Sequence, residues 1–246
     1  MAVIKVQSIR DIPKDRVYRV EATNKFYMQG KDRILKIFLD CYQRLDSKSG
    51  KDIYKILEIL MSIEGTRHLI LPEDIYLSDK RIYGYTTKYL NCPNLNYISR
   101  YVRLNDLLES YMNILEDLKV LAEKRINIFD IHAGNLLYNG SLYMLDFDLS
   151  KIDTVNSVEK IYTRAAYQVW QQILRTILYY DKYDLYTTLN HYGIRDFNLS
   201  ALQCGIMDIT SSLEVFKESL EKGLNLKDDS TLLDIDRVLR RKKNGY

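Results

Sequence analysis

Three oxygen-bearing side chains that suit a hard cation gather in one stretch, residues 126–148, which reads INIFDIHAGNLLYNGSLYMLDFD. Apolar runs over 135–138 and 141–145 flank Asn139-Gly140, and this pattern predicts a β-hairpin with a two-residue turn. Such a hairpin would bring Asp130, Asn135 and Asp146 to its mouth, where their oxygens could bind Mg2+. A surface turn with solvated acids would explain the hairpin, but not three metal-type ligands together.

The spacing of these residues resembles a known family. Asp-x4-Asn, followed by an apolar strand that ends in Asp-Phe, is similar to the catalytic and metal-binding loops of the protein-kinase-like phosphotransferases. The hexapeptide D-I-H-A-G-N over 130–135 is similar to the D-L-H-P-G-N loop of aminoglycoside- and choline-kinase-type enzymes. The chain departs from the protein-kinase pattern where Asp148 replaces the glycine of D-F-G, and where Ile128 and Phe129 replace the His and Arg of H-R-D.

The resemblance implies an α+β, two-lobed protein-kinase-like fold. The small lobe, residues 1–90, would hold five strands and one helix, and the mostly helical lobe, residues 91–246, would contain the catalytic hairpin. Hydrophobic periodicity places the strands at 2–7, 16–21, 33–38, 69–76 and 81–90. It places helices at 49–65, 104–122, 166–180, 199–220 and 231–239.

A lysine interrupts the apolar strand 33–38, and a lysine is costly to bury without a partner. Lys36 could point to water from an edge strand. It could also correspond to the V-A-I-K lysine that holds the α- and β-phosphates of a nucleotide, and the loop downstream favours this second interpretation. The family pairs that lysine with a helix glutamate, but Ile56 occupies the corresponding position here. The remaining partners for Lys36 are acids, namely Asp52, Glu58, Glu64 and Asp146.

The activity implied by the resemblance is transfer of the γ-phosphoryl group of Mg-ATP to a hydroxyl on a protein or small molecule. Asp130 would be the catalytic acid–base residue, and Asn135 and Asp146 would bind Mg2+. Lys36 would bind the phosphates, while Lys88 and Leu90 would flank the backbone that bonds adenine. His132 could touch the γ-phosphate or simply pack the loop, and Asp148 could add a metal contact.

Two features favour an alternative, a catalytically weak pseudokinase that serves as a nucleotide-binding or scaffold module. The phosphate-covering loop is expected between the first two strands, in the segment 9–16, IRDIPKDR, which has no glycine to let the backbone approach phosphates. The H-R-D and D-F-G positions are also altered. The segment after Asp148 is short, and this favours a small-molecule acceptor over a peptide.

Composition and charge bear on whether the protein binds nucleic acid, spans a membrane or is secreted. A chain of 246 residues with 46% hydrophobic and 28% charged residues is typical of a globular protein, and its net charge of +3 does not indicate nucleic-acid binding. No apolar run reaches the roughly 18 residues of a membrane span, and the N-terminus lacks the apolar core of a signal peptide. Cys41, Cys92 and Cys204 are not spaced as metal-ligand pairs, so we expect a reducing, cytoplasmic location.

Overall fold

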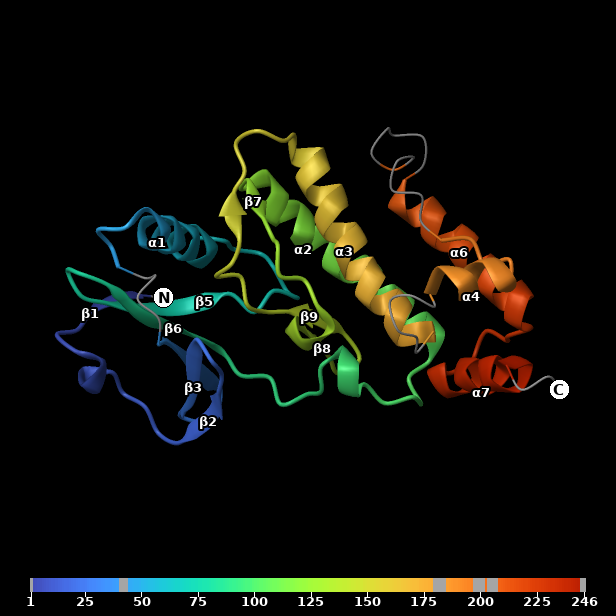
Figure 1. Cartoon of the computed structure of the whole chain (residues 1–246), viewed down its shortest axis with the longest axis horizontal. Helices are drawn as coiled ribbons and strands as arrows, with labels where there is room; N and C mark the ends of the chain where they lie inside the picture. Colours follow the sequence, from blue (N-terminus) through green and yellow to red (C-terminus); the bar gives the residue numbers. More distant parts are fainter. Residues whose placement is uncertain (1, 40–43, 179–184, 197–201, 203–207, 244–246) are drawn as a thin grey trace. The chain divides into compact units, whose positions relative to one another are not determined.

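The computed structural model describes residues 2–39, 44–178, 185–196, 202 and 208–243, and these form an α+β protein (Figure 1). The chain divides into two compact units. The first comprises 1–91, 124–130 and 144–154, and it contains a six-stranded sheet. The second comprises 92–123, 131–143 and 155–246, and it contains five of the six α-helices in the described ranges.

The sheet of the first unit has the strand order β1-β5-β6-β4-β3-β2. β1 runs parallel to β5, and every other neighbouring pair is antiparallel. The strands are β1 Ala2–Lys5, β2 Val17–Val20, β3 Asn24–Gln29, β4 Arg33–Phe38, β5 Pro72–Leu77 and β6 Ile82–Lys88.

The expectation of five strands was wrong, because β3 gives no alternating signal. Its sequence, NKFYMQ, places three apolar residues side by side, whereas a half-buried strand is recognised by alternation of polar and apolar residues. The turn expected at Gly30 is present, with φ of 68° at that glycine. As a result the strand that carries Lys36 is fourth in chain order, and it lies inside the sheet between β3 and β6.

Both faces of β4 are buried. Successive side chains of a strand point to opposite faces, so Leu35 and Ile37 pack with Ile12 on one side, while Phe38 packs with Leu57 on the other. Leu57 belongs to α1, Lys48–Met61, which is capped by Ser47, whose hydroxyl accepts the Gly50 N–H. The face that carries Lys36 is therefore the face covered by this helix.

Gly84 lets β6 approach β4 closely beside Lys36. A Cβ atom built on this glycine would lie 1.9 Å from the carbonyl oxygen of Lys36. No side chain can be accommodated at that separation unless the two strands move apart. Sequence periodicity predicted the strand, but it could not show why this position has no side chain.

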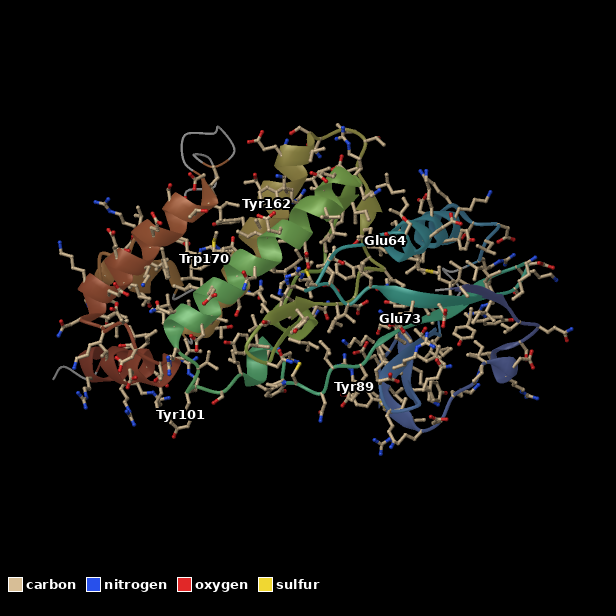
Figure 2. The ribbon with its side chains drawn as sticks, turned by 180° about the vertical axis from the view of Figure 1, so that it is seen from behind. Glu64, Glu73, Tyr89, Tyr101, Tyr162 and Trp170 are labelled. Carbon is tan, nitrogen blue, oxygen red and sulfur yellow. The ribbon has the colours of Figure 1, made fainter. Side chains whose placement is uncertain are left out.

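The second unit is built on two adjacent helices, α2 and α3, which Figure 1 shows running side by side. Trp170 of α3 is fully buried; its ring contacts those of Tyr111 at 5.5 Å and Phe216 at 4.7 Å, and its indole N–H donates to Asp196 at 2.6 Å (Figure 2). Tyr111 donates its hydroxyl to the Ala166 carbonyl at 3.0 Å. The helices are α2 Leu104–Glu123, α3 Val158–Leu178, α4 Leu185–His191, α6 Ile209–Leu224 and α7 Leu232–Lys243.

Several expected bounds needed correction. The helix expected from residue 166 begins at Val158, because the hydroxyl and carbonyl of Ser157 accept the N–H groups of Lys160 and Ile161 in the first turn of α3. Residues 199–201 and 203–207 of the helix expected over 199–220 lie outside the described part of the chain. Residues 179 and 180 of the helix expected over 166–180 lie outside it as well. The hairpin pairs β8, Leu136–Tyr138, with β9, Leu142–Met144. Its connection has three residues, 139–141, of which Gly140 alone has positive φ.

The described helices include none that is both long enough and apolar enough to cross a membrane.

Candidate functional site

The first unit buries a lysine with two aspartates. Lys36 is only 4% exposed, and its ammonium donates to Asp146 at 2.5 Å and to Asp148 at 3.0 Å. The interpretation in which Lys36 points to water is therefore wrong. Of the four acids considered from the sequence, Asp146 pairs with it, and Asp148 is a second partner; within the described residues the helix acids Asp52 and Glu58 do not. Glu64 lies beyond the end of α1 (Figure 2).

The two aspartates are held by a segment attached to the sheet. Met144 forms a parallel bridge with Leu69, just before β5, through hydrogen bonds of 2.8 Å to His68 and Ile70. Phe147, between the two acids, is 2% exposed, and its carbonyl accepts the Ser150 N–H at 3.0 Å in a tight turn. Buried apolar anchors on either side of Asp146 thus fix where its carboxylate points.

Asp146 has a left-handed backbone, with φ of 69°. This conformation is uncommon for residues other than glycine, although aspartate adopts it more readily than most, and it typically costs about 1–3 kcal/mol. The turn it creates lets Asp146 and Asp148, two residues apart, both reach the same ammonium. Strained backbone that persists at a cluster of buried charges is typical of functional sites.

The three charges change one another's proton affinity. Burial raises the pKa of Asp148 to about 7, and its hydrogen bond with Asp146 acts in the same direction. Burial also acts to raise the pKa of Asp146, but the hydrogen bond with Asp148 and the charge of Lys36 lower it below its ordinary value. For Lys36, burial would lower the pKa, yet the two carboxylates raise it. The cluster therefore keeps Lys36 charged, and below about pH 7 Asp148 rather than Asp146 holds a proton.

Three aromatic rings surround the ammonium: that of Phe38 on β4 itself, whose centroid lies 5.9 Å from the Lys36 Nζ, and two on the neighbouring strands. Phe26 on β3 and Tyr85 on β6 are the cross-strand neighbours of Lys36, and their ring centroids lie 5.7 and 5.9 Å from its Nζ. Tyr85 also donates its hydroxyl to Asp146 at 3.4 Å. Sequence reasoning missed both residues, because only the register of the strands brings them to Lys36.

Asp148 also borders a cavity within the first unit. The cavity has a volume of about 520 Å3 and lies between α1 and the segment 148–152. Ser150, which is 3% exposed, lines it as well, and the Ser150 hydroxyl has no hydrogen-bond partner in the described part of the chain. Protons can therefore reach Asp148 from this side.

Asp130 follows the two-stranded ladder of β7, Ile126–Asn127, with β10, Lys151–Ile152. Ile128 before it is buried, and Asp130 itself is half-buried. Asn127 is buried and donates its amide to Asp153 at 2.9 Å, which fixes the start of the loop. Asp130 belongs to the first unit, as do Lys36 and Asp146.

His132 and Asn135 belong to the second unit. His132 caps the short 3-10 helix η4, Ala133–Asn135: its Nδ1 accepts the Gly134 N–H at 3.0 Å, and its contact with a γ-phosphate stays a prediction. Asn135 is 7% exposed, and its backbone N–H donates to the His132 carbonyl at 2.9 Å. A Cβ on Gly134 would lie 2.8 Å from the His132 ring, so a side chain there would require the imidazole to shift.

The residues expected to contact adenine lie at the end of β6. Lys88 is the last residue of this strand and is exposed, and Leu90 is half-buried. Between them, Tyr89 donates its N–H to the Asp32 carbonyl at 2.6 Å, which ties this segment to the turn between β3 and β4. A cavity of about 460 Å3 is lined by Tyr89 and Asn91, but by neither Lys88 nor Leu90.

The segment expected to cover phosphates, 9–16, lies between β1 and β2 as expected, but these two strands do not pair with each other. Residues 9–11 form the 3-10 helix η1, and the segment 9–16 precedes β2. The hairpin that precedes the lysine strand is instead β2–β3, whose connection is Glu21-Ala22-Thr23. Glu21 donates its N–H to the Asn24 carbonyl at 2.9 Å, so this turn is tight, and it contains no glycine.

The ligand chemistry of the site suits a hard cation. Asp146 offers a carboxylate whose low pKa keeps it ionised, and Asp148 offers a second oxygen donor beside it. Among the described residues, no group of three or more His, Cys, Asp or Glu side chains is arranged to hold a metal. Mg2+ is usually bound through one or two carboxylates together with substrate phosphates, and the pair fits that mode of binding.

Neither the protein-family models nor the curated protein sequences include a match to this chain.

Proposed function

We propose that the protein is a kinase-like phosphotransferase that moves the γ-phosphoryl group of ATP to a hydroxyl acceptor. The observation that carries the proposal is the buried Lys36–Asp146 ion pair, which joins two motifs 110 residues apart in the chain. A protein fold gains little stability from burying such a pair, because desolvation offsets the attraction between the charges. Retention of the pair with a left-handed Asp146 supports a role in binding phosphates and metal.

In this mechanism each residue has one task. The Lys36 ammonium has three N–H donors and uses two on the aspartates, so the third can donate to a phosphate oxygen. Asp148 takes the place of the missing helix glutamate and holds Lys36 in position. Asp146 would hold Mg2+, which, when bound, would neutralise charge on the transferring phosphoryl group; Asn135, in the second unit, stays a predicted second ligand. Asp130 would accept the proton of the acceptor hydroxyl.

One pair of observations favours the second candidate, a nucleotide-binding scaffold. Lys36 is nearly inaccessible, and the glycine-free β2–β3 turn is too tight for its backbone to cover a phosphate closely. A scaffold would bind nucleotide without turnover. Both candidates bind a nucleotide, and they differ only in whether phosphoryl transfer follows.

The test is to measure Mg-ATP affinity and ATP turnover for the parent and Asp130→Asn side by side. We expect near-equal affinity, because Asp130 is not a nucleotide ligand in this scheme. We expect turnover to fall by about 100-fold or more, as is typical when a positioned acid–base group is lost. Asp79→Asn, at an exposed aspartate of the first unit, is the matched control. A parent that binds Mg-ATP but never turns it over would identify the scaffold.

A further inference from the structure

A small cavity in the second unit is lined by positive charge and no acid. Its volume is about 300 Å3, and it lies among the 3-10 helix η3, Leu95–Tyr97, the 3-10 helix η4 and the last turns of α3. Its lining contains two arginines and no carboxylate. The polar residues around it are Asn96, Arg100, Gln172, Arg175 and Thr176.

Arg175 has no counter-charge in the described part of the chain. It is half-buried, and its Nε atom is buried without a hydrogen-bond partner there. Buried donors are normally satisfied, and an exception calls for an explanation such as a ligand. An arginine near a helix C-terminus gains some stability from the helix dipole, but this does not satisfy a guanidinium N–H that faces away from solvent.

Arg100 adds a second, fixed positive charge. Its guanidinium donates to the backbone carbonyls of Thr176 at 2.6 Å and Leu232 at 2.9 Å, and so joins the ends of α3 and α7. These carbonyl oxygens hold the side chain in a fixed orientation. The cavity therefore combines one rigid cation with one guanidinium that has donors to spare.

The shape and chemistry of the cavity define its ligand class. A guanidinium is a planar fork that binds carboxylate or phosphate through two parallel hydrogen bonds. The amides of Asn96 and Gln172 line the same space and can donate to the same oxygens. A volume of about 300 Å3 is at the lower end for small-molecule pockets. It suits one anionic group on a short stem rather than a nucleotide or a folded peptide.

The cavity is built against the D-I-H-A-G-N segment. Ala133 lines it, and the Asn96 side-chain nitrogen lies 3.9 Å from where a Cβ of Gly134 would be. Ala133 is three residues after Asp130 in the chain. We propose that this cavity binds the carboxylate or phosphate of the phosphoryl acceptor, so that the acceptor is a small, anionic hydroxyl compound. This inference rests on the proposed phosphotransferase function.

The experiment compares small and larger alcohols that carry negative, zero or positive charge. Glycerol, glycerate and glycerol 3-phosphate, together with larger neutral, acidic and cationic alcohols, are offered with labelled Mg-ATP to the parent, Arg175→Gln, Arg175→Lys and the control Arg164→Gln. Arg164 is an exposed arginine on the same helix and does not line the cavity. We expect phosphorylation of acidic alcohols only. Their kcat/KM should fall at least tenfold in Arg175→Gln and less in Arg175→Lys, whereas Arg164→Gln should match the parent in acceptor phosphorylation and in acceptor-independent ATP hydrolysis.

A second measurement separates this inference from the proposed function. Binding of citrate and inorganic phosphate is measured by titration calorimetry without nucleotide, on the parent and on Arg175→Gln with confirmed parental melting. A parent that binds these anions through Arg175 but never uses ATP would overturn the proposed function while retaining the anion site. A parent that phosphorylates neutral or cationic alcohols as well as acidic ones, or that binds anions as tightly after Arg175→Gln, or not at all, would overturn the inference.

Discussion

The ammonium of Lys36 donates to the carboxylate of Asp148 at 3.0 Å, across 112 residues of chain. Asp148 occupies the position where the D-F-G motif of the resembled family has glycine, so this contact would be impossible for the usual sequence. With Asp146 also at 2.5 Å, two acids face one base inside the first unit. Like charges so close cannot both ionise without cost, so the stability of the fold should depend on pH.

Asp148 should make the protein less stable as the pH rises towards neutral. Its pKa in the folded state is raised to about 7 by burial and by Asp146, whereas an unfolded aspartate titrates near 3.8. Between these values the folded state binds more protons, so the free energy of unfolding falls as pH increases. We expect the parent to lose about 1–3 kcal/mol between pH 5 and pH 8 relative to Asp148→Asn.

The measurement is urea unfolding of both proteins at several pH values in the presence of a chelator. The comparison with Asp148→Asn removes contributions from groups that the two proteins share. Asp146 affects a separate range: its lowered pKa stabilises the fold above the ordinary value of 3.8, and that stability is lost as pH falls below it. Parallel stability curves for the two proteins from pH 5 to 8 would show that Asp148 carries no extra proton.

Lys36→Met should weaken binding of ATP far more than binding of adenosine. Hydrogen bonds to charged groups contribute about 1.5–3 kcal/mol, so we expect ATP affinity to fall by about ten- to 100-fold and adenosine affinity to change little. The assay belongs at pH 5.5, where Asp148 is protonated and the substitution leaves only one buried carboxylate unpaired. Lys5→Met, at an exposed lysine of the same sheet, is the control. Equal losses for both ligands would indicate a folding defect instead.

The sequence was sufficient to find Lys36 and Asp146, because a lysine within an apolar strand and an Asp-Phe after a hairpin are local patterns. It could not find Phe26 and Tyr85, since their place beside Lys36 depends on the pairing of β3, β4 and β6. The role of Asp148 depends on the left-handed turn at Asp146, and hydrophobic periodicity in the sequence does not indicate such a turn.

The helices and strands were also predicted with unequal success, because some have a periodicity of their own and others do not. Long amphipathic helices such as α2 have a periodicity that survives in the sequence, and the expected range of 104–122 agrees closely with Leu104–Glu123. β3 is only half-buried along most of its length, and its three adjacent apolar residues do not alternate with polar ones, so the sequence gives no strand signal there. The start of α3 depends on a serine cap, which lies outside the apolar stripe that was used to place the helix.

Asp146→Asn should abolish the effect of Mg2+ on nucleotide binding. The amide keeps the size of the side chain and can still accept from Lys36 and Tyr85, but it lacks the charge that a hard cation requires. We expect ATP to bind the parent more tightly with Mg2+ than with chelator, and the variant equally in both. Asp79→Asn should behave as the parent. If Asp146→Asn retained the full Mg2+ enhancement, the metal would have to be assigned to other residues.

Gly84 offers a test of how strictly the sheet positions Lys36. A methyl group there would meet the Lys36 carbonyl at 1.9 Å, and the atom in its way is backbone, which cannot rotate aside. Gly84→Ala should therefore push β6 from β4 and cost about 3 kcal/mol or more, the upper range for overpacking.

Gly65→Ala is the informative comparison, because Gly65 has φ of 81° but a methyl group there would meet nothing within 4 Å, so only backbone strain of about 1 kcal/mol is expected. The measurement is urea unfolding together with Mg-ATP affinity: Gly84→Ala should lose both, and Gly65→Ala should lose a little stability but no affinity. Equal stability losses in the two variants would mean that the strands separate easily, and that Lys36 is not held by the spacing of β4 and β6.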